Sequence, residues 1–165
     1  MSELLNKEPV KRVEKKLQEF DSGYSVIVLD SSARTAQEAA ASLNTDVGSI
    51  VKSLLFKSEN NFVLCLVSGD KRCSLNKLKK IKKSKDISMA NPQSVKEITG
   101  FTIGGVSPIG HLKKVEIFLD NNLNRFQDIY AAAGHPNCVF KVNFENLLKM
   151  TNGIVEDITE WNLLL

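Results

Sequence analysis

Four glycines and one proline fall between Gly100 and His111, in a chain that has only nine glycines and four prolines. Glycine admits positive φ angles and lets a ligand approach the main chain, whereas proline fixes φ, so together they build a stiff loop. Such a loop can offer N–H groups to an anion or to a carbonyl oxygen. The same residues are also typical of a helix cap and of ordinary turns, and the pattern alone leaves both interpretations open.

The other candidates for side-chain chemistry form no recognisable catalytic or metal-binding pattern. His111 and His135 stand apart without a metal-ligand spacing, and the three cysteines are scattered, so we expect no metal site and no cofactor. A triad of Ser107, His135 and Asp120 can be written, but such a trio can be found in nearly any chain. An enzyme with this sequence would therefore work by positioning and main-chain electrostatics rather than by a strong side-chain nucleophile.

Positive charge is concentrated in one segment. The formal net charge is only +3, yet residues 71–85 carry eight of the 22 basic residues and no acidic one. The segment is poor in aromatic residues, so it suits contact with phosphates better than the reading of bases, and it predicts a surface for a polyanion such as nucleic acid. A solvated helix face is the alternative interpretation.

Length and composition are those of one globular domain, with 165 residues, of which 42% are hydrophobic and 25% charged. The N-terminal residues contain no long apolar run, and the apolar segments further on are soon interrupted. The sequence therefore predicts neither a signal peptide nor a membrane span. We expect a single domain over residues 1–165 that is cytoplasmic and has no membrane partner.

Helices are predicted where apolar residues recur at helical spacing behind a capping residue. Pro9 suits the first turn of a helix over residues 8–20, and Thr35 with Glu38 has capping-box spacing for a helix ending near Leu43. Ser74 is expected to cap the lysine-rich helix, which can bury only one side. Further helical segments are predicted from Asn91-Pro92 to Ile98, ended by Gly100, at 123–126 and at 143–150.

The predicted strands are apolar or β-branched runs between turn residues, at 24–30, 61–68, 87–90, 115–120, 128–134, 138–143 and 154–159. The segment from Asp46 begins as a helix and continues into a strand. This puts Lys52 near a helix-to-strand junction, where a side chain can point into a cleft. Strands that are joined both by helices and by short turns predict an α+β fold with a mixed sheet.

Five segments, taken in order, resemble the YbaK family of editing domains, which are related to the insertion domain of bacterial prolyl-tRNA synthetase. They are TAQEAAASLNTDVGSIVKSLLF, FVLCLVSGDKR, TGFTIGGVSPIGH, FLDNNL and AAAGHP, and the similarity runs from about Thr35 to Met150. Each segment alone is unspecific, but their order and spacing together are specific. The resemblance implies one α+β domain with a mixed, partly barrel-like β-sheet flanked by helices, and helix 8–20 as a variable extension.

The resemblance also implies an activity, which is hydrolysis of the ester between a wrong amino acid and the terminal adenosine of a tRNA by a free-standing domain. The key lysine of the family matches Lys52, its G-x-x-x-P loop matches residues 104–108, and its late closing loop matches residues 134–136, although the family varies at His135. The residues expected to act in catalysis are Lys52, Gly104 and Gly105. Those expected to bind the substrate are Ile50, Val106, Ser107, Pro108, Gly134 and His135, and those expected to bind tRNA are Lys77, Lys79, Lys80, Lys82 and Lys83.

An aminoacyl ester is already activated, so its hydrolysis mainly needs a held carbonyl, a placed water and a stabilised oxyanion. Gly104 and Gly105 would offer N–H donors, and Lys52 would place positive charge beside the ribose, phosphate or oxyanion. A synthetase pocket cannot strongly reject a smaller amino acid, because one methylene is worth only about 1–3 kcal/mol. The expected substrates are therefore small residues such as alanine, cysteine or serine, on tRNA-Pro or a related tRNA.

Two other functions stay open at this point. A non-catalytic module of the same fold would bind tRNA or a synthetase without turnover, and its binding would be sensitive to salt. A hydrolase for a small ester or a nucleotide would leave the lysine-rich helix merely solvated. In either case Lys52 could be a surface lysine at a helix end.

Overall fold

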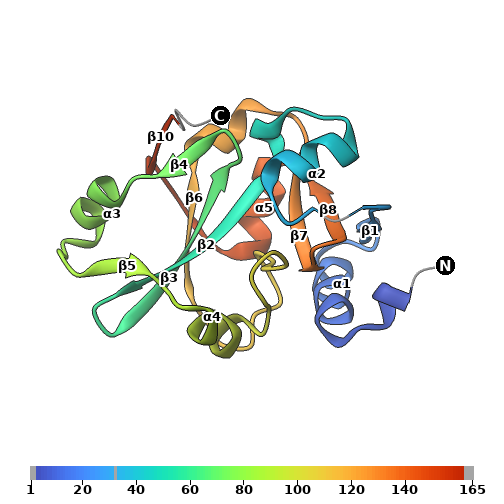
Figure 1. The fold of residues 1–165 in the computed structure, drawn as a ribbon, viewed down its shortest axis with the longest axis horizontal. Helices are drawn as coiled ribbons and strands as arrows, with labels where there is room; N and C mark the ends of the chain where they lie inside the picture. The colour runs from blue at the N-terminus through green and yellow to red at the C-terminus, as the bar shows by residue number, and fades with distance from the viewer. Residues whose placement is uncertain (1–2, 32, 162–165) are drawn as a thin grey trace.

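A mixed five-stranded sheet forms the centre of the computed structural model, which describes residues 3–31 and 33–161 (Figure 1). The strand order is β5-β2-β3-β6-β9. β2 pairs antiparallel with β3 and β5, whereas β6 runs parallel to β3 and β9 runs parallel to β6, so the predicted mixed sheet is confirmed. The strands are β2 Val51–Ser58, β3 Asn61–Ser68, β5 Ile87–Met89, β6 Glu116–Asp120 and β9 Ile154–Glu156.

Two smaller antiparallel sheets flank the central one. One has the order β1-β8-β7, with β1 Ile27–Val28, β7 Ile129–His135 and β8 Cys138–Val142. The other pairs β4 Lys71–Cys73 with β10 Thr159–Trp161. In the described part of the chain the strands thus form three open sheets and no closed barrel, which corrects the expectation of a partly barrel-like sheet.

Four of the α-helices described, α2 to α5, begin at a residue whose side chain accepts a free backbone N–H of the first turn. The Thr35 hydroxyl accepts the N–H of Glu38, and the Glu38 carboxylate accepts the N–H of Thr35, which confirms the predicted capping box. Ser74 caps the lysine-rich helix, also as predicted. None of the helices described could cross a lipid bilayer, since all are too short or too polar. The helices are α1 Glu8–Phe20, α2 Ala36–Leu43, α3 Leu75–Lys82, α4 Pro92–Thr99 and α5 Phe144–Thr151, with 3-10 turns η1 Glu3–Asn6, η2 Val47–Ser49 and η3 Asn121–Arg125.

Apolar side chains pack on both faces of the central sheet. On one face Val51 and Leu55 of β2 join a large core that α1 completes with fully buried Val10, Val13 and Leu17. On the other face Phe56 packs with Leu78, the fully buried residue of α3. Each such leucine contributes roughly 1.5–3 kcal/mol of burial free energy. The lysine-rich helix is therefore anchored by its apolar stripe, and its basic side faces outward.

Two predicted strands differ from the structure by more than a residue or two, and one strand of the structure was not predicted. The strand expected at 24–30 shrinks to β1, because the N–H of Val26 donates to the Glu14 carboxylate and the N–H of Leu29 donates to a turn carbonyl. The strand expected at 154–159 is divided into β9 and β10 by a turn in which the N–H of Ile158 donates to the Asp120 carboxylate. A third strand, β4, was not predicted, because it is short and pairs only with β10, which is distant in the sequence.

Candidate active site

A cavity of about 370 Å³ lies between β2 and the hairpin of β7 and β8. Its volume is at the small end of the usual range for ligand sites, about 300–1,000 Å³. The start of α2 and the loop at 103–106 complete its walls, which are mainly apolar. Among the lining residues are Ala33, Arg34, Thr35, Ile50, Val51, Lys52, Ser53, Leu55, Met89, Ala90, Val95, Ile103, Gly104, Val106, Tyr130, Ala132, Pro136 and Val139.

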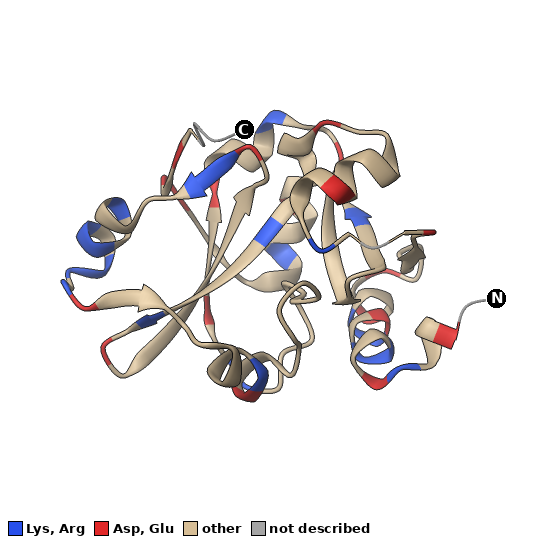
Figure 2. Ribbon diagram, in the orientation of Figure 1, with Lys and Arg blue, Asp and Glu red and all other residues tan. Residues whose placement is uncertain are grey.

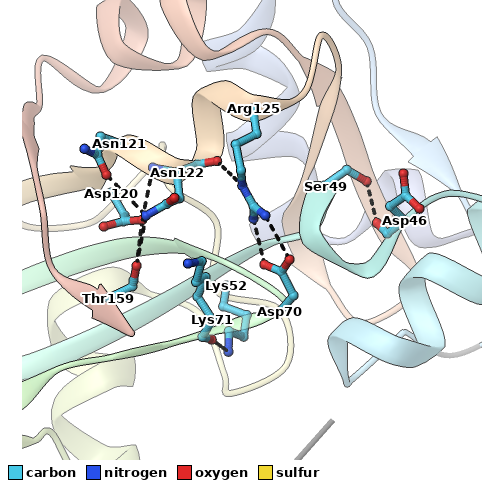
Figure 3. Close-up of polar contacts among 10 residues, drawn as sticks. All are labelled: Asp46, Ser49, Lys52, Asp70, Lys71, Asp120, Asn121, Asn122, Arg125 and Thr159. Carbon is cyan, nitrogen blue, oxygen red and sulfur yellow. Dashed lines mark hydrogen bonds and ion pairs between the residues drawn. The ribbon is translucent and has the colours of Figure 1, made fainter. Parts of the chain in front are cut away.

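Lys52 occupies the second position of β2, directly after the turn η2. The turn is closed at Ser49, whose N–H and hydroxyl both donate to the carbonyl of Asp46 (Figure 3). The predicted helix-to-strand junction is therefore confirmed. The side chain of Lys52 is partly buried, and its Nζ donates a hydrogen bond to the main-chain carbonyl of Lys71 in β4 (Figure 3). A single ammonium group is thus held at the cavity by a neighbouring strand.

Burial lowers the pKa of Lys52 below the ordinary lysine value, and the Asp70 carboxylate and the Cys73 sulfur oppose part of this change. Asp70 is itself held by a two-pronged ion pair with Arg125, in which Nη2 lies 2.7 Å from Oδ1 and Nη1 lies 3.1 Å from Oδ2 (Figure 3). The guanidinium shares the negative charge of Asp70, so this carboxylate neutralises Lys52 only in part.

A buried carboxylate, that of Asp120, holds in place the strands around the carbonyl that binds Lys52. Asp120 is fully buried, and its oxygens accept the N–H of Ile158 and the hydroxyl of Thr159, both at 2.9 Å (Figure 3). These bonds fix the start of β10. At its end Trp161 pairs with Lys71, and the Lys71 ammonium lies 3.3 Å from the centre of the indole ring. Asp120 and Trp161 thereby position the carbonyl that binds Lys52.

The glycine loop presents fewer free donors than we expected. Gly104 has a φ of +96° and lines the cavity, and the N–H groups of Gly104 and Val106 have no partner among the residues described. The N–H of Gly105, by contrast, donates to the carbonyl of Thr102 at 3.0 Å. A Cβ on Gly105 would lie 2.9 Å from the backbone nitrogen of His135. Gly105 is thus needed for close packing of two main chains, and its predicted role as a donor does not hold in this structure.

Two other loop residues lie outside the cavity. Ser107 is fully buried, and its hydroxyl accepts the N–H of Ile109 while its carbonyl bonds Nε2 of His111. Pro108 faces a second, open groove on the other side of the loop. Both residues therefore fix the shape of the loop instead of contacting a ligand in the cavity.

The late loop reaches the cavity through Pro136. The N–H of Gly134 donates to the carbonyl of Gly105 at 3.0 Å, so Gly134 is a packing partner of the glycine loop. His135 lies next to the cavity without lining it, and its Nδ1 accepts the N–H of Asn137. Of the expected substrate-binding residues, only Ile50 and Val106 belong to the cavity wall.

None of the predicted tRNA-binding lysines lines the cavity, because α3 lies on the other side of β2 from α2 (Figure 1). Basic residues cover α3 and the turn after it (Figure 2). Lys77 pairs with Asp157 at 2.9 Å, and Lys82 pairs with Glu116. Lys79, Lys80 and Lys83 have no ion pair with any residue described, and these three are available to a polyanion.

Sequence reasoning missed several polar residues of the cavity, among them Arg34, Ser53 and Tyr130. The hydroxyl of Ser53 is buried and has no hydrogen-bond partner among the described residues. Arg34 directly precedes the capping box of α2, and Tyr130 lies in a predicted strand. Neither position has a sequence signal that distinguishes a cavity residue from a structural one.

The described residues thus form an α+β domain with a small, mainly apolar cavity and a held ammonium group, features that are typical of a small-ligand site. The family model of the aminoacyl-tRNA editing domain matches residues 30–150. The chain belongs to this family, as the sequence resemblance predicted.

Similar proteins include proline–tRNA ligases and a free-standing chain. The chain is 33% identical over 159 residues to a proline–tRNA ligase of Caldicellulosiruptor saccharolyticus, covering 94% of this chain but only 26% of the ligase. It therefore spans about a quarter of that relative. It is 32% identical over 123 residues to the uncharacterised protein YwhH of Bacillus subtilis, covering 74% of this chain and 78% of YwhH.

A solved structure with a TM-score of 0.87 and 37% identity covers 93% of this chain and 98% of its own. It is provisionally described as a trans-editing enzyme for prolyl tRNA synthetase. A second structure, of a hypothetical protein, has a TM-score of 0.84 and 25% identity over 90% of this chain. The α+β fold class is therefore that of trans-editing domains.

Proposed function

We propose that this protein is a trans-acting aminoacyl-tRNA deacylase, which hydrolyses the ester of a mischarged tRNA carrying a small amino acid such as alanine, cysteine or serine. The tRNA would be tRNA-Pro or a related one, bound by its acceptor end in the cytoplasm, and a synthetase is a candidate partner. The observation that carries the proposal is the held ammonium of Lys52 at a small cavity beside unpaired loop N–H groups, in a member of the editing family.

The cavity suits the hydrolysis of an activated ester. Water attacks the acyl carbon, the carbonyl becomes an oxyanion, and the bond to the ribose oxygen breaks with a proton passing to that oxygen. The N–H groups of Gly104 and Val106 are candidate donors to the oxyanion. Lys52 adds a positive charge whose effect is strengthened by the mainly apolar walls. A ribose hydroxyl beside the ester could orient the water.

Size selection follows from the same walls. Ile50, Val106 and Ala132 line the cavity, and these apolar side chains would limit the room for the acyl group. A small acyl group would fit without strain, whereas a larger one would be disfavoured by about 1–3 kcal/mol for each methylene.

The test is ester release from charged tRNA. The purified full chain is incubated with tRNA-Pro that carries alanine, cysteine, serine or proline, and the remaining aminoacyl-tRNA is measured with time. We expect rapid loss of one small amino acid and slow loss of proline. Lys52→Ala should abolish most of the activity, and Lys57→Ala, at an exposed position of the same strand, should not. Binding without turnover for every charged tRNA would favour the non-catalytic module.

A further inference from the structure

Arg34 stands at the mouth of the cavity with its charge unpaired. It lines the cavity and is exposed, and its guanidinium has no hydrogen bond or ion pair with any residue in the described ranges. The nearby Glu38 carboxylate accepts the backbone N–H groups of Arg34 and Thr35 instead. A guanidinium without an acidic partner is well suited to bind a phosphate, because its planar set of donors matches two phosphate oxygens.

A neutral histidine near Arg34 offers a further hydrogen-bond donor. Burial lowers the pKa of His135, and the charges of Lys7 and Arg34 lower it further, so both cations lie within electrostatic range of the ring. Nδ1 of His135 accepts the N–H of Asn137 at 3.1 Å, so the neutral ring carries its proton on Nε2. His135 can therefore donate a hydrogen bond without being charged.

Main-chain bonds hold these residues together at the cavity. The N–H of Ala33 donates to the carbonyl of Pro136 at 2.9 Å, which ties the segment before α2 to the late loop. Gly104 lies between the two, because a Cβ built on it would be 3.5 Å from Cγ of Pro136 and 3.7 Å from Cγ of Arg34. Arg34 and the candidate oxyanion donor Gly104 thus share one wall of the cavity, whereas α3 contributes no residue to it.

We propose that Arg34, with His135 beside it, binds the phosphate of the nucleotide whose aminoacylated ribose enters the cavity. This inference rests on the proposed function and adds to it a phosphate site that is separate from α3. The 5′ phosphate of the terminal nucleotide is the phosphate nearest to the reacting ester in covalent terms. Binding this phosphate at the mouth of the cavity would fix the distance between the ester and Gly104. Arg34 would therefore orient the substrate as well as hold it.

The experiment compares two stable probes that differ only in one phosphate. They are 3′-deoxy-3′-alanylamino-adenosine and its 5′-phosphorylated form, whose amide replaces the ester, and their affinities are measured by calorimetric titration with the full chain. We expect the phosphate to improve binding to the wild-type protein about ten-fold, as for one charge-assisted contact. Arg34→Gln should remove this gain and leave the affinity for the unphosphorylated probe unchanged. Lys57→Gln, a matched loss of one exposed cation, should keep the gain.

Failure of this inference and failure of the proposed function give different results. The phosphate site is overturned if the phosphate brings no gain to the wild-type protein, or if Arg34→Gln weakens both probes equally. The deacylase function is overturned by absence of ester release from charged tRNA, and a phosphate gain that persists in that case still supports the site. Thermal melting of both variants without ligand checks that neither substitution has disturbed the fold.

Discussion

The ammonium of Lys52 donates its hydrogen bond to the main-chain carbonyl of Lys71, a residue of the adjacent strand β4. Burial lowers the pKa of Lys52, and the carboxylate of Asp70, next to Lys71, is the main group that opposes this. The pKa of Lys52 therefore depends on groups around β4 as well as on burial, and substitutions there should change its titration without touching Lys52.

The first prediction concerns the pH profile of ester release. Asp70→Asn removes the charge that raises the pKa of Lys52, so the ammonium should be lost at lower pH and the alkaline limb of kcat/KM should move to lower pH. Arg125→Gln breaks the ion pair between Arg125 and Asp70 but keeps the Asp70 carboxylate, which then lacks its cation. The second variant should therefore shift the alkaline limb to higher pH. Shifts in the same direction would contradict this account.

The second prediction separates the lysine-rich helix from the cavity. Replacing Lys79, Lys80 and Lys83 by Gln should weaken binding of whole tRNA, because these lysines have no ion pair among the residues described. The dependence of log Kd on log salt should fall by up to about three units of slope. Binding of a short aminoacyl-adenosine probe should be unchanged. An unchanged salt dependence would instead indicate that α3 is merely solvated.

The third prediction concerns the buried carboxylate under β10. Asp120→Ala removes the acceptor of the Ile158 N–H and of the Thr159 hydroxyl, and leaves both buried groups without their partner. The free energy of unfolding should fall by about 2–4 kcal/mol in urea titrations. Asp157→Ala removes a more exposed ion pair with Lys77 and should cost less than about 1 kcal/mol. Equal effects would argue against a special role of Asp120.

The fourth prediction is a stability change with pH caused by His111. Burial lowers the pKa of this ring below its ordinary value, although the carbonyl of Ser107 opposes the effect. As the pH falls below about 6.5, the unfolded chain takes up a proton that the folded protein refuses, so the free energy of unfolding should decrease. His111→Leu should make this decrease smaller between pH 7 and pH 5 in urea titrations. An identical slope in both proteins would refute the assignment.

Local signals predicted the helices well, because each start is encoded by a neighbouring side chain. The capping box at Thr35, the cap at Ser74 and the Asn-Pro pair before α4 all act within a few residues, and the corresponding helices begin where they were predicted. The short strands β4 and β10 could not be predicted in the same way. Each is only three residues long, and pairing between the middle of the chain and its C-terminal part gives them their structure.

The site was predictable in part. Lys52, Gly104, Ile50 and Val106 were expected to contact the substrate, and all four line the cavity. The sequence could not show which of two adjacent glycines keeps a free N–H, because that depends on the path of the loop past Thr102. Arg34 was overlooked because the residues next to it form a helix cap, and this structural role accounts for the local pattern.

The carbonyl that holds Lys52 belongs to the backbone, and this affects how the protein tolerates mutation. Any amino acid at position 71 would supply the same oxygen, so exchange of the Lys71 side chain could alter the contact with Trp161 yet spare the anchor itself. Loss of the anchor would require a slip of β4 along β10. The hydrogen bond that holds Lys52 should therefore be lost more readily through insertions or deletions in the turn before β4 than through single replacements at position 71.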